Sequence, residues 1–375
     1  MGEDQIQDLV GYDHKLNRLF TVPHPSSQSQ QKVTSISRPY LRNPKSHTIR
    51  SPKDVFQLLA VLYHVITIYP LLPALLLSIY AIYNPLYILL AALLSLILPR
   101  TFTHRSRVLR SLPMWRLFAS YFPIHLYRST PLPLAGKYIF GYHPHGILSH
   151  GAFTAFATEA LGFSELFPGI ENSLLTLDSS FRIPIYRDYL LLLGMNSVSR
   201  KSCENLLTTS GHDTKEYGRA ITIVIGGAKE SLEAIPNNMR LVLRNRKGFV
   251  KLAIQTGASL VPVVAFGEND LYTMETDLDP KTLSGRVQLF LKQKLGFTVP
   301  LFYAKGPHWF DFGIMPYARP VNVVVGRPIE TRIVEGIVDG AYLNEIHGRY
   351  IEEVERIWRE WRGVFASGCG EMEIL

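Results

Sequence analysis

The stretch that decides the fold is Tyr138-Ile139-Phe140-Gly141-Tyr142-His143-Pro144-His145-Gly146, an apolar run that ends in two histidines and a glycine. Pro144 biases His143 toward an extended backbone, and side chains two residues apart in an extended chain point the same way. We therefore expect a strand whose end carries both imidazoles toward one pocket. Because histidine accepts a proton near neutral pH, this pattern predicts a general base, with His143 preferred to His145.

Two other interpretations of this pair remain open. One is a buried structural histidine that is hydrogen-bonded to the backbone. The other is half of a zinc site, which would need two or three more ligands at suitable spacing. His150 is the one further histidine close by, and the chain's two cysteines, Cys203 and Cys369, stand far apart. We therefore expect neither a metal site nor a disulfide framework.

Short β-rich runs that end in glycine turns recur after residue 130, between amphipathic segments. Strands are predicted at 138–142, 221–225, 260–266 and 321–325. A helix that begins near Tyr342 has an apolar stripe, formed by Leu343, Ile346, Tyr350, Val354, Ile357 and Trp361. This alternation is typical of an α/β domain, which we place at residues 101–375 as a mixed sheet with flanking helices.

Residues 55–99 contain no Asp, Glu, Lys or Arg. This block is too long for one membrane-spanning helix and suits two, because each needs about 20 residues. Cationic residues flank both ends, so the pattern predicts a transmembrane or re-entrant helical hairpin over residues 51–100, with both ends in the cytosol. Residues 1–50 are rich in polar residues and are predicted to form a flexible cytosolic arm.

The net charge of +8 is unevenly distributed. No Asp or Glu occurs between Val55 and Thr158, whereas seven cations do: Arg100, Arg105, Arg107, Arg110, Arg116, Arg128 and Lys137. A basic face beside an apolar block is suited to anionic lipid headgroups and phosphate-rich ligands. Aromatic-and-basic modules typical of nucleic-acid binding are missing from the sequence, so nucleic acid is not an expected partner.

A second motif, Gly226-Gly227-Ala228-Lys229-Glu230, follows the predicted strand at 221–225. Its glycines allow the backbone to approach a substrate closely, as does Gly146, and Glu230 would orient a histidine or bind the acceptor. The alternative is a tight turn with Glu230 in the first turn of a helix. Further on, Arg244, Arg246 and Lys247 open an amphipathic helix, which suits a phosphate-bearing ligand or a solvated helix face.

With these motifs the chain resembles the diacylglycerol acyltransferase 2 family, which includes monoacylglycerol acyltransferases and wax synthases. The matching segments are Tyr121–Ile124, Tyr142–Gly146, Arg187–Tyr189, Gly226–Glu230, Arg246–Phe249, Val261–Pro262, Phe266–Tyr272, Met315–Tyr317 and Gly326–Ile329. They occur in order across residues 121–329, behind the predicted hairpin.

The resemblance implies a glycerolipid acyltransferase-type fold. It also implies an enzyme that makes triacylglycerol by acyl transfer from acyl-coenzyme A to diacylglycerol. It places the catalytic histidine motif on His143 to Gly146 and a second element on Gly226 to Glu230. Other glycerolipid acyltransferases have an Asp five residues after the histidine, but this sequence has Leu148 and His150 there. We predict that Glu230, rather than Asp188 or Glu268, replaces it.

In the mechanism that this resemblance implies, the histidine activates the diacylglycerol hydroxyl and amides near Gly146, Gly226 or Gly227 bind the oxyanion. No covalent intermediate is expected, because the sequence lacks a nucleophile elbow, although Ser149 is a competing candidate. Acyl-coenzyme A is a substrate, bound by Arg244, Arg246 and Lys247, and no cofactor is expected.

The expected location is the endoplasmic reticulum membrane or a lipid droplet, and a homo-oligomer is compatible with the sequence. Monoacylglycerol or a fatty alcohol remains an alternative acceptor, because one hydroxyl or methylene changes discrimination only modestly in an apolar pocket. A non-catalytic lipid-droplet scaffold or lipid carrier is the alternative of a different class.

Overall fold

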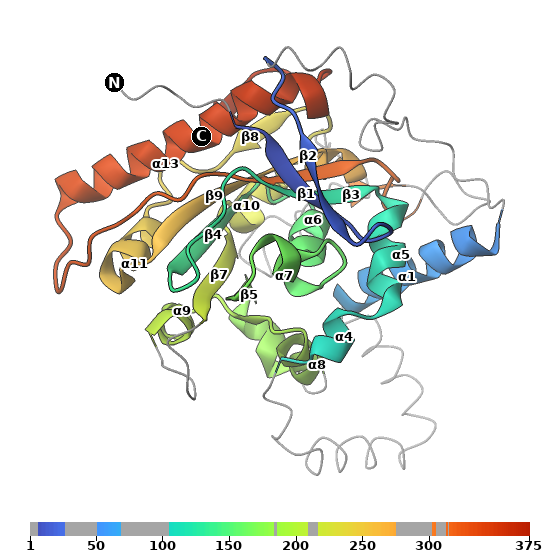
Figure 1. Ribbon diagram of the computed structural model, residues 1–375, viewed down its shortest axis with the longest axis horizontal. Coiled ribbons are helices and arrows are strands. Elements are labelled where there is room, and N and C mark those ends of the chain that lie inside the picture. Colours follow the sequence, from blue (N-terminus) through green and yellow to red (C-terminus); the bar gives the residue numbers. More distant parts are fainter. Residues whose placement is uncertain are drawn as a thin grey trace, which may run out of the picture.

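The computed structural model describes residues 7–26, 51–68, 105–183, 186–208, 217–274, 302–304, 313 and 315–375. Within these residues the central element is a nine-stranded sheet with strand order β2-β1-β3-β12-β9-β4-β7-β5-β6 (Figure 1). Its strands are β1 (Leu9–Asp13), β2 (Arg18–Val22), β3 (Ile124–Arg128), β4 (Lys137–His143), β5 (Ile170–Thr176), β6 (Asn196–Ser197), β7 (Gly218–Val224), β9 (Ser259–Phe266) and β12 (Val321–Val325). Two short pairs lie outside this sheet, β8 (Met239–Leu241) with β13 (Met372–Ile374) and β10 (Thr273–Met274) with β11 (Phe302–Tyr303).

The middle of the sheet is parallel, because β4 pairs in parallel with both β7 and β9. Beyond β9 the direction reverses, since β12 runs antiparallel to β9 and parallel to β3. Alternate residues of β9 enter different cores: Leu260 and Val264 pack on one face, and Val261 and Val263 on the other. The four strands predicted from the sequence are confirmed as β4, β7, β9 and β12.

Helices cover both faces of the sheet. They are α1 (Pro52–Ile68), α4 (Arg107–Arg110), α5 (Pro113–Tyr121), α6 (His150–Ala152), α7 (Phe163–Leu166), α8 (Tyr186–Leu192), α9 (Arg200–Thr208), α10 (Gly227–Ser231), α11 (Gly248–Thr256) and α13 (Gly340–Phe365), with shorter turns η3 (Phe153–Ala157), η4 (Asp178–Arg182) and η5 (Glu268–Leu271). Buried residues of α1 and α5 belong to one core, and those of α9, α11 and α13 to the other. Figure 1 shows α13 along one side of the sheet and α1 with α5 on the other.

The predicted stripe of α13 is largely confirmed, because Ile346, Tyr350, Val354, Ile357 and Trp361 are all buried. A mixed sheet with flanking helices is therefore the fold of the described residues, as the sequence predicted.

The interpretation of residues 1–50 as a flexible arm is wrong for residues 9–22. These residues form a hairpin in which β1 pairs antiparallel with β2 and with β3, so the hairpin forms one edge of the main sheet. Leu9 and Val22 are buried, and this burial anchors the hairpin. Residues 27–50 lie outside the described part.

The predicted hairpin of residues 51–100 falls mostly outside the described residues, which include only its first part, α1. This helix buries Ala60, Val61 and Val65 against the core, and Gln57 Nε2 donates to Ser120 Oγ of α5 at 2.7 Å. Among the described residues, no helix has both the length and the apolar character that a bilayer crossing requires. The membrane-spanning part of the prediction is thus unsupported by the described structure.

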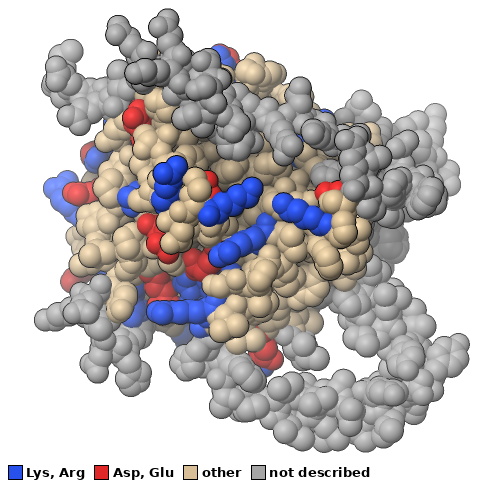
Figure 2. All heavy atoms as spheres, turned by 45° about the vertical axis from the view of Figure 1, so that its right-hand side comes forward, with Lys and Arg blue, Asp and Glu red and all other residues tan. Residues whose placement is uncertain are grey.

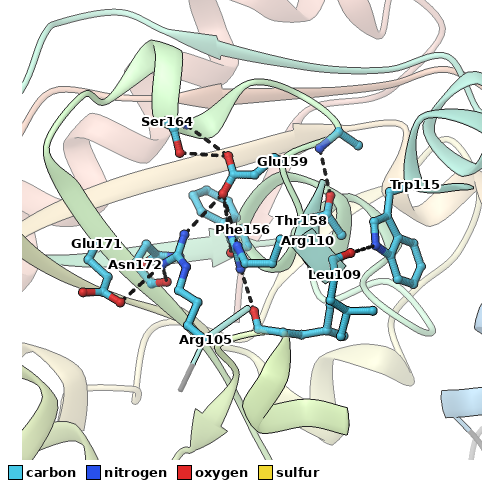
Figure 3. A network of polar contacts seen from close by, with 12 residues as sticks. Arg105, Leu109, Arg110, Trp115, Phe156, Thr158, Glu159, Ser164, Glu171 and Asn172 are labelled. Atoms are coloured by element: carbon cyan, nitrogen blue, oxygen red, sulfur yellow. Dashed lines mark hydrogen bonds and ion pairs between the residues drawn. The ribbon is translucent and has the colours of Figure 1, made fainter. Parts of the chain in front are cut away.

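Charge counting along the sequence overestimated the basic face. Arg110 is buried, and its guanidinium contacts the Glu159 carboxylate at 3.0 Å, while Arg105 contacts the same carboxylate at 3.3 Å (Figure 3). Burial lowers the pKa of Arg110 to about 10. These two cations therefore join α4 and the segment before it to the segment after η3. Lys and Arg side chains still form a band across the face in Figure 2.

Candidate active site

The motif loops meet at the carboxyl edge of the parallel strands. β4, β7 and β9 end at His143, Val224 and Phe266, and the histidine motif, the Gly-Gly motif and the loop with Glu268 follow them directly. Ligands of open α/β sheets bind at this edge, because loops from neighbouring strands converge there.

His143 is completely buried under α13. Its Nε2 lies 3.0 Å from the hydroxyl of Tyr350, which donates to the carbonyl of Gly141 at 3.1 Å. Gly141 is required here, since a Cβ at this position would lie 2.0 Å from the Tyr350 hydroxyl oxygen. Burial lowers the pKa of His143 to about 3, so the ring is neutral and enclosed at physiological pH.

His145 has a different environment. It follows the end of β4 and is partly exposed, and its Nδ1 lies 3.0 Å from the carbonyl oxygen of Gly146. Because a carbonyl only accepts, Nδ1 carries the proton and Nε2 presents its lone pair. Burial lowers the pKa of His145, which keeps the ring in this neutral form. Of the two histidines, His145 therefore has the geometry of a general base.

Glu230 holds the histidine loop by its backbone. Its Oε1 accepts from the amide of His145 at 2.6 Å, and its Oε2 accepts from the amide of Val242 at 2.7 Å. Burial raises the pKa of this carboxyl to about 7, against the effect of the two amides. The sequence predicted that Glu230 orients a histidine. Its carboxylate instead holds the backbone of His145, and among the described residues it makes no hydrogen bond to an imidazole.

Glu268 lies on the other side of the same loop. Its Oε2 accepts from the hydroxyl of Tyr142 at 2.7 Å and from the amide of Gly151 at 3.0 Å, and burial raises its pKa to about 7. Gly146 adopts a φ of +58°, and a Cβ there would lie 2.7 Å from Cγ of Glu268. The loop is therefore held between two buried carboxyl groups.

The two glycines of the second motif differ in role. A Cβ at Gly226 would lie 2.2 Å from the carboxyl carbon of Glu230, so this glycine makes room for the carboxylate. Gly227 has a φ of +60°, and its missing Cβ faces open space. The sequence predicted that a substrate approaches closely at both glycines, but only Gly227 has the open space for it.

The predicted phosphate-binding residues lie in the loop between β8 and α11. Arg246 Nη2 donates to the Gly226 carbonyl at 3.1 Å, and Lys247 Nζ donates to Asn344 Oδ1 at 2.7 Å. Arg244 Nη2 donates to the Ile374 carbonyl at 3.1 Å. Arg244 and Arg246 are exposed, so both remain accessible to an anionic ligand, and Arg246 links this loop to the Gly-Gly turn.

Sequence reasoning missed the surroundings of His150, the residue five positions after His145. His150 is buried, its Nε2 lies 2.8 Å from the Tyr272 hydroxyl, and its ring stacks on Phe122 with centroids 5.3 Å apart. His64 of α1 lies beside it, with ring centroids 5.4 Å apart. Phe122 and Tyr272 both lie in segments that match the family, and this match was the one sign in the sequence that they belong to the site. No three His, Cys, Asp or Glu side chains in the described part of the chain are grouped to hold a metal ion.

Other motif segments also contact one another. The Tyr121 hydroxyl donates to the carbonyl of Pro316 at 2.8 Å, and the amide of Gly326 donates to the carbonyl of Pro262 at 2.8 Å. In the comparison with known proteins, the family model described as "Diacylglycerol acyltransferase" matches residues 75–368, which include all of these segments. The chain belongs to the diacylglycerol acyltransferase family.

Individual relatives agree with this membership. The chain is 46% identical to Diacylglycerol O-acyltransferase 2A of Umbelopsis ramanniana over 262 residues, which is 70% of this chain and 72% of the relative. It is 47% identical to Diacylglycerol O-acyltransferase 1 of Schizosaccharomyces pombe over 70% of this chain and 73% of the relative. It is also 42% identical to 2-acylglycerol O-acyltransferase 1 of Bos taurus over 72% of this chain and 78% of the relative. No solved structure matches the chain.

Proposed function

We propose that this family member is an acyl-CoA:diacylglycerol O-acyltransferase that makes triacylglycerol by direct transfer, with His145 as the general base. The observation that carries the proposal is the tautomer of His145. Its proton is held on Nδ1 by Gly146, and the Nε2 lone pair belongs to a partly exposed ring at the carboxyl edge of the sheet. This assignment reverses the preference for His143 that the sequence suggested, because His143 is enclosed beneath Tyr350.

In this mechanism, Nε2 of His145 takes the proton from the acceptor hydroxyl as its oxygen attacks the thioester carbon. The tetrahedral intermediate then collapses, the carbon–sulfur bond breaks, and the imidazolium returns the proton to the departing coenzyme A sulfur. Backbone amides at Gly146 or Gly227 are the proposed donors to the oxyanion. Glu230 positions the base through the backbone amide of His145, and Arg244, Arg246 and Lys247 contact the donor's phosphates.

Membrane attachment is part of the proposal. The side of α1 that faces away from the core exposes Val55, Phe56, Leu59 and Tyr63, with Phe56 and Leu59 more than half exposed. An apolar stripe of this kind suits the acyl region of a bilayer surface. The uncharged block of residues 55–99 supports a hairpin attachment to the endoplasmic reticulum or a lipid droplet, through which diacylglycerol reaches the site.

Monoacylglycerol is the second candidate acceptor, favoured by the similarity to a 2-acylglycerol O-acyltransferase. The deciding experiment supplies labelled oleoyl-coenzyme A to the purified protein in micelles with diacylglycerol, monoacylglycerol or a fatty alcohol. The proposal expects triacylglycerol as the main product. Transfer to monoacylglycerol alone would replace the acceptor, and no transfer to any of the three would favour a scaffold or lipid carrier.

A further inference from the structure

A cavity of about 200 Å³ lies beside the histidine motif, on the α13 side of the sheet. Pro144 forms part of its wall, so the cavity is one residue away from His145. The other walls come from the end of β9 and the η5 turn that follows it, from residues 237–239 at the start of β8, and from the last turns of α13 with the segment that follows them. By comparison, a cavity of about 150 Å³ holds a benzene molecule, so this space accommodates a short polar chain.

Two of the lining side chains carry buried polar atoms that lack a hydrogen-bond partner among the described residues. They are the indole Nε1 of Trp358, a donor, and the amide Oδ1 of Asn269, an acceptor. Both side chains are more than nine-tenths buried. Unpaired buried groups of this kind are costly, which indicates that a ligand with one acceptor and one donor completes them.

The charge of the lining limits what this ligand can be. Asp270 is its single charged residue, so the cavity does not suit a phosphate or a carboxylate. A neutral group with a carbonyl and an N–H, such as a secondary amide, matches both unpaired atoms. Apolar lining residues, among them Phe266 and Phe365, suit the methylene groups on either side of such an amide.

The cavity and the described part of the predicted membrane hairpin lie on different faces of the sheet. Trp358 belongs to the core on the α13 face, whereas the buried residues of α1 belong to the other core. A lipid acceptor that arrives along α1 therefore approaches from the opposite face, and a water-soluble donor is the natural occupant of the cavity.

The basic loop lies within reach of the same donor. β8 leads from Met239 in the cavity wall toward Arg244, and these residues are at most about 18 Å apart, because an extended chain spans up to about 3.6 Å per residue. One donor molecule can thus contact the cavity with an uncharged arm and the loop with its phosphates.

We propose that this cavity binds the pantetheine arm of the acyl-coenzyme A donor, with one amide of the arm accepting from Trp358 Nε1 and donating to Asn269 Oδ1. The thioester at the end of the arm then lies next to Pro144 and faces His145. The assignment of the donor rests on the proposed acyltransferase function, whereas the binding of the arm can be tested without catalysis.

Kinetics of Trp358→Phe test the amide contact, since phenylalanine removes the N–H and keeps a ring against Phe266, on which Trp358 stacks. For S-oleoyl-N-acetylcysteamine, which has one amide of the arm, kcat/KM should fall about 2- to 10-fold, as expected for one neutral hydrogen bond. For S-oleoyl-mercaptoethanol, which has no amide, it should stay unchanged. Trp361→Phe, one turn along α13 and outside the cavity lining, is the matched control.

Equal losses with both thioesters would overturn the proposal and reduce Trp358 to a packing role. An unchanged Trp358→Phe enzyme would also overturn it, and a higher KM for diacylglycerol alone would assign the cavity to the acceptor. Failure of the wild-type enzyme to use any acyl donor would instead reject the proposed function.

Alkylation of Cys369, which lines the cavity, measures binding alone. S-methylpantetheine, which has both amides but no phosphate or acyl chain, should slow the reaction of Cys369 with N-ethylmaleimide, followed by mass spectrometry. The protection should weaken in Trp358→Phe and persist in Trp361→Phe. Protection by diacylglycerol in place of S-methylpantetheine, or by neither ligand, would overturn the proposal whether or not the protein is an acyltransferase.

Discussion

The hydroxyl of Tyr350 joins the last long helix to the histidine motif, because it lies 3.0 Å from Nε2 of His143. The single proton of this hydroxyl is donated to the carbonyl of Gly141, so the oxygen accepts from Nε2–H of His143. His143 is thereby fixed in one tautomer at the end of β4, two residues before His145. The relationship makes His143 a support for the loop, and its role can be tested.

Tyr350→Phe should lower the melting temperature of the protein, because it leaves the Nε2–H of His143 unpaired in the core at a cost of about 1–3 kcal/mol. Activity per folded molecule should fall less than it does on loss of His145. Tyr342→Phe is the matched control on the same helix, since its hydroxyl accepts from the amide of Arg332 near the surface. Equal melting temperatures for the two variants would contradict the buried bond.

The two histidines should respond differently to alanine. His145→Ala should reduce turnover by roughly 100- to 10,000-fold, the usual contribution of a positioned general base, with the amount of folded protein close to wild type. His143→Ala should mainly reduce the yield of folded protein, because it removes a buried, hydrogen-bonded side chain. Specific activity normalised to folded protein decides between them. A large loss confined to His143→Ala would return the role of base to His143.

The sequence was sufficient to predict the central strands and the stripe of α13, because both follow from the alternation of apolar residues along one element. It could not predict the hydrogen bond between the hydroxyl of Tyr350 and His143. The stripe indicates that Tyr350 is buried, but it does not indicate which polar atom its hydroxyl contacts. The two residues are 207 positions apart in the chain. The bond depends on how α13 crosses β4.

The shared direction of the two imidazoles was a local inference that failed at the end of the strand. β4 ends at His143, so Pro144 and His145 lie outside the strand and its two-residue period does not extend to them. The hairpin of β1 and β2 was missed for a related reason. Each of its strands has only five residues, which is a short pattern. The strand that pairs with the other edge of β1 is β3, which lies more than 100 residues further along the chain.

The basic loop between β8 and α11 should act on the donor. A double substitution, Arg246→Ala with Lys247→Ala, should raise the apparent KM for acyl-coenzyme A several-fold and leave that for diacylglycerol unchanged, because charge-assisted contacts to phosphate are worth about 1.5–3 kcal/mol. Lys251→Ala, an exposed lysine of α11, should change neither. Equal rises for both substrates would assign Arg246 and Lys247 to the fold, for instance through the bond of Arg246 to Gly226.

The exposed side of α1 should contact lipid. A photo-crosslinking phenylalanine analogue in place of Phe56 should attach to labelled phospholipid in proteoliposomes, because this position is exposed, apolar and next to the uncharged block. The same analogue in place of Ile337, the most exposed large apolar residue in the described chain, is the control. Similar crosslinking at both positions would mean that exposure alone, and not a membrane surface along α1, explains the result.

Glu230 should not tolerate an amide. Each of its carboxylate oxygens accepts from a backbone N–H, so in Glu230→Gln the new NH₂ group must face the amide of His145 or of Val242. Turnover and melting temperature should both fall, whereas Glu233→Gln, which weakens a surface ion pair with Arg240, should change each very little. Wild-type behaviour of Glu230→Gln would show that the position of His145 does not depend on this carboxyl.

The pH dependence of the same variant tests the state of the carboxyl. Burial raises the pKa of Glu230 to about 7 from the ordinary value of 4.5, so the folded protein binds more protons than the unfolded chain between these two pH values. This group therefore stabilises the fold below pH 4.5, and its contribution is lost as the pH rises through 7. Buried histidines such as His143 contribute with the opposite sign, since burial lowers their pKa, so the pH dependence of the wild-type melting temperature alone is ambiguous.

The difference in melting temperature between wild type and Glu230→Gln removes the histidine contribution and should shrink as the pH rises from 5 to 8. A difference that stays constant over this range would mean that the carboxyl does not titrate there.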